Sequence, residues 1–263
     1  MLAVLAGAGV AQADPWIPAA GNGSAKVMVR LFNANRAFSS TGFGTATVPA
    51  SKQSETQLRA TGEQGIGGGF SIEYDLRAGK RQDSRTKLGV TSNLSATGLE
   101  DQEVGLNYGL IQSPLAALSV TVNVLAPTGN QHSAPALGTG HFAIEPDVQA
   151  GFKTGALTLT GEFGSRMFTD SGVAQLRATL YAGWRVLPRI TLFGTGFVSR
   201  TVQRAASLSL SDQAEVYNVL RVGGGAEYKL TPCLRPYAEY EQNIAGQGIH
   251  AGDRITLGVS VSF

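Results

Sequence analysis

Residue types that often carry catalysis or metal binding are sparse in this chain of 263 residues. The three histidines, His132, His141 and His250, lie in or beside predicted links between strands, and their spacing matches no zinc or metalloprotease motif. The only cysteine, Cys233, excludes a disulfide within the chain. The glycine-rich run 65–69 lacks the Lys-Ser/Thr ending of a phosphate loop and predicts a tight turn. We expect no metal, no cofactor and no catalytic residues.

Charged side chains instead follow a period of two, which is the signature of strands with two different faces. In one segment Leu176, Leu180 and Trp184 share a face, whereas Arg177 and Arg185 lie on the other. The same alternation predicts about twelve strands, an even number. We place them near 25–38, 54–65, 68–79, 99–111, 116–126, 142–153, 156–168, 174–187, 189–201, 214–230, 233–243 and 253–263.

Alternation alone does not decide whether the apolar face meets a protein core or lipid. Three features favour lipid. The predicted strands are about 10–13 residues long, which suits a tilted membrane strand, whereas soluble strands average about 5–6. Trp184, Tyr228 and Phe263 lie near strand ends, where an aromatic girdle would place them. The third feature is the alternation of link lengths.

The predicted links are alternately short and long, which is typical of a membrane barrel. Short links fall near 66–67, 112–115, 154–155, 188 and 231–232, and longer ones near 39–53, 80–98, 127–141, 202–213 and 244–252; the link near 169–173 breaks the contrast. Residues 85–94 fit an extra hairpin arm above the membrane. The mean hydropathy of +0.01 also fits alternating faces. The predicted fold is all-β: a transmembrane antiparallel up-and-down β-barrel of about twelve strands, closed because hydrocarbon tolerates no unpaired edge.

In such a barrel the charged face turns inward. The candidate lumen-lining residues are Arg30, Glu73, Asp75, Arg77, Glu103, Glu145, Asp147, Glu162, Arg166, Arg177, Arg185, Arg221, Glu227, Arg235, Glu239 and Arg254. Two interpretations stay open. The charges either form cross-strand ion pairs that stiffen a mostly filled lumen, or they line a narrow wet path that selects solutes by charge and size.

Some membrane barrels hydrolyse lipids with a serine and a histidine on the outer face. Here the alternation places Ser165 on the apolar, lipid-facing side of its strand, but that strand carries no histidine. We therefore do not expect an enzyme. The net charge of +2 also gives no reason to expect a nucleic-acid partner.

The two ends of the sequence indicate export. Residues 1–13 resemble a removed signal peptide, with an apolar run and an Ala11-Gln12-Ala13 cleavage site, although the basic n-region is missing. Residues 14–263 would then form one barrel domain. The last segment, 254–263, alternates and ends on Phe263, like the strand that such barrels present to the barrel assembly machinery. We expect a Gram-negative outer-membrane location with both termini periplasmic.

Three segments also carry a family resemblance: Trp16 with a first strand ending Asn35-Arg36-Ala37-Phe38, the run 98–108 (GLEDQEVGLNY), and a strand ending in Pro127-Thr128-Gly129. The chain resembles the phenol-degradation MetA-pathway-like outer-membrane proteins, which include XagA-like exopolysaccharide-associated proteins. This loose resemblance covers most of residues 14–263. It implies a barrel that moves hydrophobic or aromatic compounds, or one tied to surface polysaccharide, and it carries over no functional residue.

Two functions remain. The first is a porin-like channel or transporter for small solutes, hydrophobic or aromatic ones included. The second is a structural or surface-interaction barrel associated with exopolysaccharide or adhesion. The expected partners are outer-membrane lipid, the assembly machinery, and either small-molecule solutes or extracellular polysaccharide.

Overall fold

The described chain is mostly β-strand. The computed structural model describes residues 14–39, 41–87, 90–203 and 215–263, so the expected signal at 1–13 lies outside the described residues. Within the described ranges no helix is long and apolar enough to cross a bilayer. The strands are β1 (Gly23–Phe38), β2 (Thr47–Gly67), β3 (Phe70–Lys87), β4 (Val90–Leu99), β5 (Gln102–Gln112), β6 (Ala116–Ala126), β7 (Ala143–Thr154), β8 (Leu157–Phe168), β9 (Ala174–Leu187), β10 (Ile190–Gln203), β11 (Asn218–Tyr228), β12 (Leu234–Gln247) and β13 (His250–Ser262).

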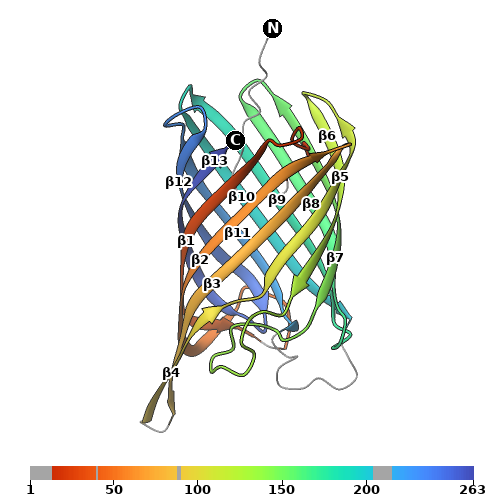
Figure 1. Cartoon of the computed structure of the whole chain (residues 1–263). Coiled ribbons are helices and arrows are strands. Elements are labelled where there is room, and N and C mark those ends of the chain that lie inside the picture. The colour runs from red at the N-terminus through yellow and green to blue at the C-terminus, as the bar shows by residue number, and fades with distance from the viewer. Residues whose placement is uncertain (1–13, 40, 88–89, 204–214) are drawn as a thin grey trace.

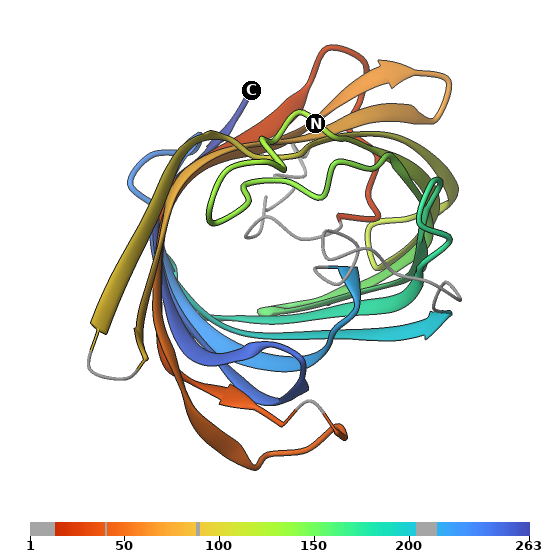
Figure 2. The same cartoon turned by 90° about the horizontal axis from the view of Figure 1, so that it is seen from below.

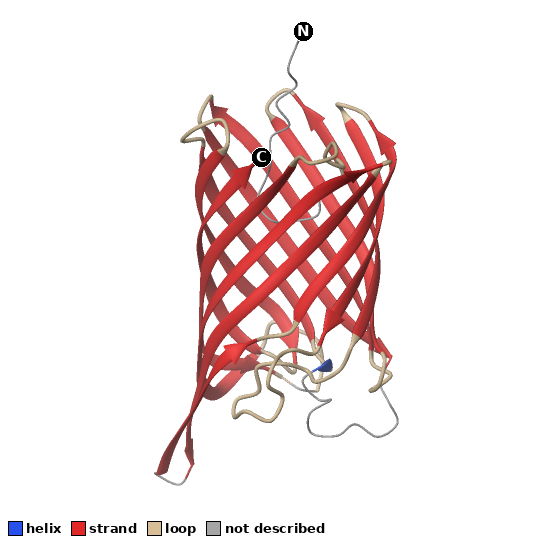
Figure 3. Ribbon diagram, in the orientation of Figure 1, coloured by secondary structure: helices blue, strands red, loops and turns tan. Residues whose placement is uncertain are grey.

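These strands form one closed antiparallel barrel with up-and-down connectivity (Figures 1 and 3). The pairing of β1 with β13, which sets Val27 opposite Val259, closes the ring. Closure leaves the wall without an unpaired edge, as a bilayer requires. The expected all-β barrel of about twelve strands is confirmed, since β1–β3 and β5–β13 make up the ring.

β4 lies outside this ring and pairs with β3. One edge of β3 pairs with β2, and its other edge has two partners: residues 70–75 pair with β5 and residues 78–87 pair with β4. The far parts of β3 and β4 therefore leave the barrel as a hairpin arm, drawn at the bottom of Figure 1. This arm matches the hairpin expected around 85–94. The single strand expected at 99–111 is divided instead, with Glu100 and Asp101 between β4 and β5.

The distribution of side chains is inside-out relative to a soluble protein. Leu257 and Val259 are 56% and 38% exposed on the outer wall. In contrast, Arg254 and Glu241 form an ion pair in the interior, where their side chains are 17% and 10% exposed. An exposed apolar band around a polar interior is the arrangement expected when the outer wall meets hydrocarbon.

The two ends of the barrel differ in their links. The short links 68–69, 113–115, 155–156, 188–189 and 229–233 share one end with Gly23 and Phe263, whose backbones hydrogen-bond (Figure 1). At 68–69 the expected tight turn is present, and Gly68 and Gly69 have φ of 63° and 82°, which favour glycine. We call this end the short-turn end. The links 127–142 and 169–173 and the described residues of the link 39–46 lie at the opposite, long-loop end, where β10 ends and β11 begins.

Several strand boundaries differ from the sequence prediction. The link expected at 244–252 shrinks to 248–249, because Gly248 at a φ of 70° allows β12 and β13 to meet in a tight turn. β2 is longer than the expected 54–65 because its first residues, from Thr47, pair with the end of β1. β11 begins at Asn218 rather than 214, and the link before it is described only from Glu215.

Candidate functional site: the barrel interior

A polar cavity of about 700 Å³ occupies the interior. Its wall runs from Asp14 and Lys26 near the short-turn end to Ile249 and His250 at the long-loop end. Twelve of the sixteen candidate lumen residues lie on this wall: Arg30, Glu73, Asp75, Arg77, Glu103, Glu145, Glu162, Arg166, Arg177, Arg221, Glu239 and Arg254. Whether they contact a solute stays a prediction.

The other four candidates have different positions. Asp147 is buried and its Oδ2 accepts a hydrogen bond from Asn123 at 2.8 Å. Glu227 and Arg235 are buried and paired with each other at 3.5 Å. Arg185 is exposed at the short-turn end, where it donates to the Gly155 carbonyl, and it is not among the residues that line the cavity.

A chain of ion pairs follows one part of the wall. It begins on β2 and β3, where Asp75 is bound by Arg59 at 2.5 Å and by Arg77. It continues through Glu103 of β5, which lies 3.6 Å from Arg77. Residues that alternate in sign on neighbouring strands tie those strands together laterally.

The same chain ends on β7, β8 and β9. Arg166 bridges Glu103, at 2.5 Å, and Glu145, and Arg177 binds Glu145 at 2.5 Å. Four arginines thus share three carboxylates, and these side chains are 4–24% exposed. Each carboxylate contacts two guanidiniums, which is the pairing that a partly desolvated charge requires. This part of the wall supports the structural interpretation of the charges.

A second, separate group lies on β1, β11, β12 and β13. Here Arg30, Arg221 and Arg254 all approach the carboxylate of Glu241, at 3.2, 3.8 and 3.5 Å. The alternation predicted that these side chains point inward. It did not predict that three of them share one acid, because register between distant parts of a ring is not encoded in any single strand.

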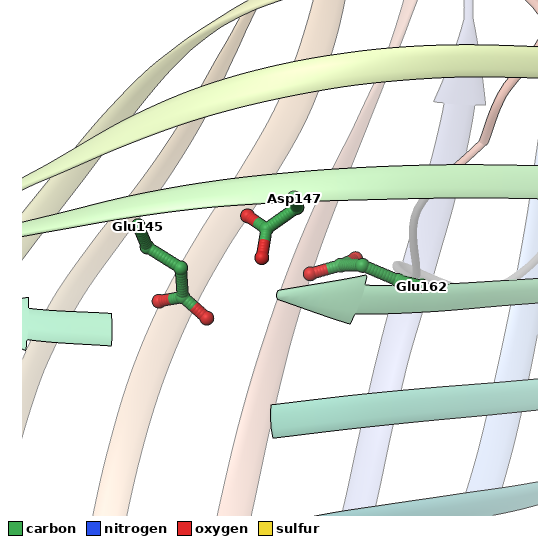
Figure 4. Close-up of side chains that lie close together, drawn as sticks. All are labelled: Glu145, Asp147 and Glu162. Atoms are coloured by element: carbon green, nitrogen blue, oxygen red, sulfur yellow. The ribbon is translucent and has the colours of Figure 1, made fainter. Parts of the chain in front are cut away.

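An acidic cluster lies where β7 and β8 meet. Ligand-type oxygens of Glu145, Asp147 and Glu162 are all within 4.8 Å of one another (Figure 4). Carboxylate oxygens suit hard divalent cations. Both oxygens of Glu145, however, already accept hydrogen bonds from Arg177, and one also accepts from Arg166. We therefore assign Glu145 to the ion-pair chain and do not assign a metal site to the cluster.

Aromatic side chains also face the interior, although the pattern of charged residues did not predict them. Met28, Tyr181, Phe193 and Tyr237 form a buried cluster inside the ring. They occupy inward positions of their strands, so the alternation could have placed them. Phe197 lies between two guanidiniums, with Arg177 and Arg221 each 5.2 Å from its ring centre. Such contacts are cation–π interactions.

The segment 14–22 lies inside the short-turn end. Trp16 Nε1 donates to the Ser113 carbonyl at 2.7 Å, and Lys153 Nζ lies 3.5 Å from the centre of the indole ring. The side-chain amide of Gln112 makes two hydrogen bonds to the segment: its NH₂ group donates to the Pro15 carbonyl at 2.7 Å, and its oxygen accepts from Ile17 N at 3.0 Å. Gly151 leaves the room that the indole needs: a Cβ there would be 2.4 Å from the ring. The segment narrows this mouth.

The link 127–142 lies across the opposite mouth (Figure 2). Asp101 holds it, because one oxygen accepts from Gly129 N at 3.0 Å and the other from Thr139 N at 2.7 Å. Arg81 donates to the Ala136 carbonyl at 2.6 Å, and Leu137 is buried. His132 and His141 belong to this link. Both mouths are therefore narrowed by segments that lie outside the strands.

A closed barrel with an apolar outer wall, a charged interior and long links at one end belongs to the class of outer-membrane β-barrels. Comparison with known proteins agrees at the level of the fold. No family model and no curated protein matches the chain.

Several solved structures share the fold. The COG4313 outer membrane channel from Pseudomonas putida F1 is 15% identical, with a TM-score of 0.75, over 97% of this chain and 100% of that one. The translocator domain of the autotransporter NalP from Neisseria meningitidis is 14% identical, with a TM-score of 0.51, over 92% of this chain and 88% of that one. The KdgM porin is 10% identical, with a TM-score of 0.50, over 90% and 99%. These likenesses agree with a general outer-membrane barrel, and the narrower MetA-pathway-like or XagA-like resemblance stays a prediction.

Proposed function

We propose that this protein is a passive channel for small solutes, aromatic ones included, in the outer membrane of a Gram-negative bacterium. The observation that carries the proposal is the cavity of about 700 Å³, whose wall residues extend from the short-turn end to the long-loop end. A polar path through a closed barrel gives solutes an aqueous route that the surrounding lipid denies them.

The asymmetry of the barrel supports the orientation in the membrane. Barrels of this class have short periplasmic turns and longer outer loops. We therefore assign the short-turn end, with Gly23 and Phe263, to the periplasm and the link 127–142 to the cell exterior. Delivery by a removed signal peptide at 1–13 is part of the same proposal.

The size of the interior supports small solutes rather than large ones. A ring of twelve strands lies between filled eight-stranded barrels and open sixteen-stranded porins. Side chains, the segment 14–22 and the link 127–142 narrow it further. A solute of a few rings or fewer fits this space, because small-molecule sites typically measure about 300–1,000 Å³.

Planar-bilayer recording with the purified full chain tests the proposal. We expect discrete conductance steps in KCl, and liposomes that contain the protein should swell in small sugars or amino acids but not in large oligosaccharides. Protein that is folded, as judged by its heat-dependent migration on a gel, yet shows neither steps nor swelling would rule out the channel.

One observation favours the surface-interaction alternative. The β3–β4 arm extends beyond the barrel at the long-loop end, where it can meet material outside the cell (Figure 1). If binding is the function, a chain that lacks residues 82–95 should lose retention on exopolysaccharide while its conductance stays unchanged. The channel proposal expects no retention of either form.

A further inference from the structure

Three guanidiniums compete for one carboxylate in the middle of the barrel. Arg30, Arg221 and Arg254 lie 3.2, 3.8 and 3.5 Å from oxygens of Glu241. A guanidinium has five N–H donors, and a carboxylate offers about four acceptor positions. Asn243 accepts one further hydrogen bond, from Arg221 Nε at 3.0 Å. Most donors of this cluster therefore have no protein acceptor among the described residues.

The cluster also has an excess of positive charge. Three cations surround Glu241, whereas in the ion-pair chain on the other part of the wall four arginines share three acids. Neighbouring groups leave this excess in place. The nearby acid Glu239 accepts a hydrogen bond from the Thr195 hydroxyl at 2.9 Å rather than from a guanidinium, and the nearby cation Arg59 is paired with Asp75 outside the cluster.

Limited contact with water makes this excess matter. The three arginine side chains are 15–17% exposed, and Glu241 is 10% exposed. Like charges this close are only partly screened, so an incoming anion would relieve their repulsion. Planar guanidiniums bind carboxylates in two-point geometry.

Aromatic rings flank the same guanidiniums. Phe197 lies 5.2 Å from Arg221, and Phe32 lies 5.8 Å from Arg254, measured from the ring centres to the guanidinium carbons. Both phenylalanines are on the wall of the cavity. A carboxylate on the arginines would thus hold its carbon skeleton beside two phenyl rings, which favour a flat aromatic group.

We propose that Arg30, Arg221 and Arg254, together with Phe32 and Phe197, form a binding site for small aromatic carboxylates. The inference rests on the proposed channel function and names its solute class: the carboxylate binds the arginines and the ring lies against the phenylalanines. A site with spare donors and one internal carboxylate holds such a solute weakly enough for it to leave again.

Calorimetric titration of the folded, detergent-solubilised full chain with sodium benzoate tests the site. We expect binding, and we expect Arg221→Gln or Arg254→Gln to weaken it about tenfold, the effect of one charge-assisted hydrogen bond. The matched control is Arg185→Gln, which removes an exposed arginine outside the cavity and should leave the affinity unchanged. Phe197→Leu keeps every charge and should weaken binding about threefold or more through the lost ring contact.

Glu241→Gln should change the benzoate affinity in the opposite direction. It removes the internal carboxylate that competes for the arginines, so benzoate should bind more tightly than to the unmodified chain. Acetate, which has the charge but no ring, should bind less tightly than benzoate, and benzamide, which has the ring but no charge, should not bind. A benzoate affinity that is zero, or unchanged in both folded Arg221→Gln and Phe197→Leu, would overturn the site.

Different results would overturn the channel proposal and the binding-site proposal. Titration needs no conductance, so benzoate binding without any current would leave the site and remove the channel. Current in KCl without benzoate binding would leave the channel and remove the site.

Discussion

At the scale of single residues, the interior consists of charges whose partners differ in number. Arg166 bridges two carboxylates, Glu103 and Glu145, whereas Glu241 receives three guanidiniums. The first arrangement satisfies its groups within the chain. The second leaves donors for a solute. Arginines and carboxylates therefore stabilise the barrel wall in one place and leave hydrogen-bond donors for a solute in another.

Removal of Arg166 should destabilise the barrel. Arg166→Gln leaves Glu103 without its shortest ion pair, and loss of one partner of a buried pair costs about 3–5 kcal/mol. We expect a lower urea concentration at the midpoint of unfolding, measured in lipid vesicles by loss of the heat-modifiable gel band. Arg185→Gln, at an exposed arginine, serves as the control and should unfold like the unmodified chain. Equal midpoints for the two variants would contradict the structural role of the ion-pair chain.

Glu100, between β4 and β5, should make stability depend on pH. Burial, and secondly the nearby charge of Glu55, raise the pKa of this carboxyl, whose Oε2 accepts from Gln57 at 2.6 Å. A carboxyl group with a raised folded-state pKa stabilises the fold at low pH, and this contribution is lost as the pH rises through the folded pKa.

Glu100→Gln removes the titration but keeps an acceptor for Gln57. We expect the midpoint of the variant, relative to that of the unmodified chain, to rise as the pH increases from the ordinary pKa of a glutamate carboxyl, 4.5, through the raised folded-state pKa. Urea titrations at several pH values measure the difference. A difference that is constant over this range would show that Glu100 does not titrate on unfolding.

At the scale of elements, the segment 14–22 should restrict the short-turn mouth. Trp16→Ala removes a hydrogen bond to Ser113 and the contact with Lys153, each worth about 1 kcal/mol. The segment should then leave its place more often and single-channel conductance should rise. Trp184→Ala is the matched control, since Trp184 is 60% exposed on the outer wall. An unchanged conductance in Trp16→Ala would mean that the segment does not limit the path.

Strands could be predicted from sequence more readily than the segments that bind to them. The alternation around Leu176 and Leu180 indicates both the strand and the residues that share its apolar face, because every second residue has the same environment. The segment 14–22 has no such period, and its position depends on contacts that are distant in sequence, such as the Trp16 indole beside Gly151 and the hydrogen bonds of Gln112 with Pro15 and Ile17. The link 127–142 is likewise fixed by contacts with Asp101 that are distant in sequence.

The candidate site was predictable in its composition but not in its grouping. The alternation predicted that Arg30, Arg221 and Arg254 face inward, together with most other charged residues. Their convergence on Glu241 depends on the closing pair β1–β13, which no local pattern reveals. Phe32 and Phe197 also occupy inward positions, but they were not among the candidates because they carry no charge.

At the scale of the whole molecule, the orientation in the membrane can be measured with the native thiol. Cys233 is exposed in the short link 229–233. In whole cells a bulky maleimide reagent should therefore label it only after the outer membrane is permeabilised. Gly42→Cys, in a chain with Cys233→Ser, is the control at the long-loop end, where a side chain meets open space. It should be labelled in intact cells, and the reverse pattern would place the short-turn end outside.

The connectivity also has a consequence for assembly. Almost every strand pair joins neighbours along the chain, so the sheet can grow hairpin by hairpin with little loop-closure entropy to overcome. Only the β1–β13 seam must bring together segments from the two extremes of the sequence. Until that seam forms, β1 and β13 each expose a full row of backbone donors and acceptors. We therefore expect the β1–β13 pairing to form last and slowly. Substitutions along this seam should delay insertion more than equal substitutions on β6 or β7.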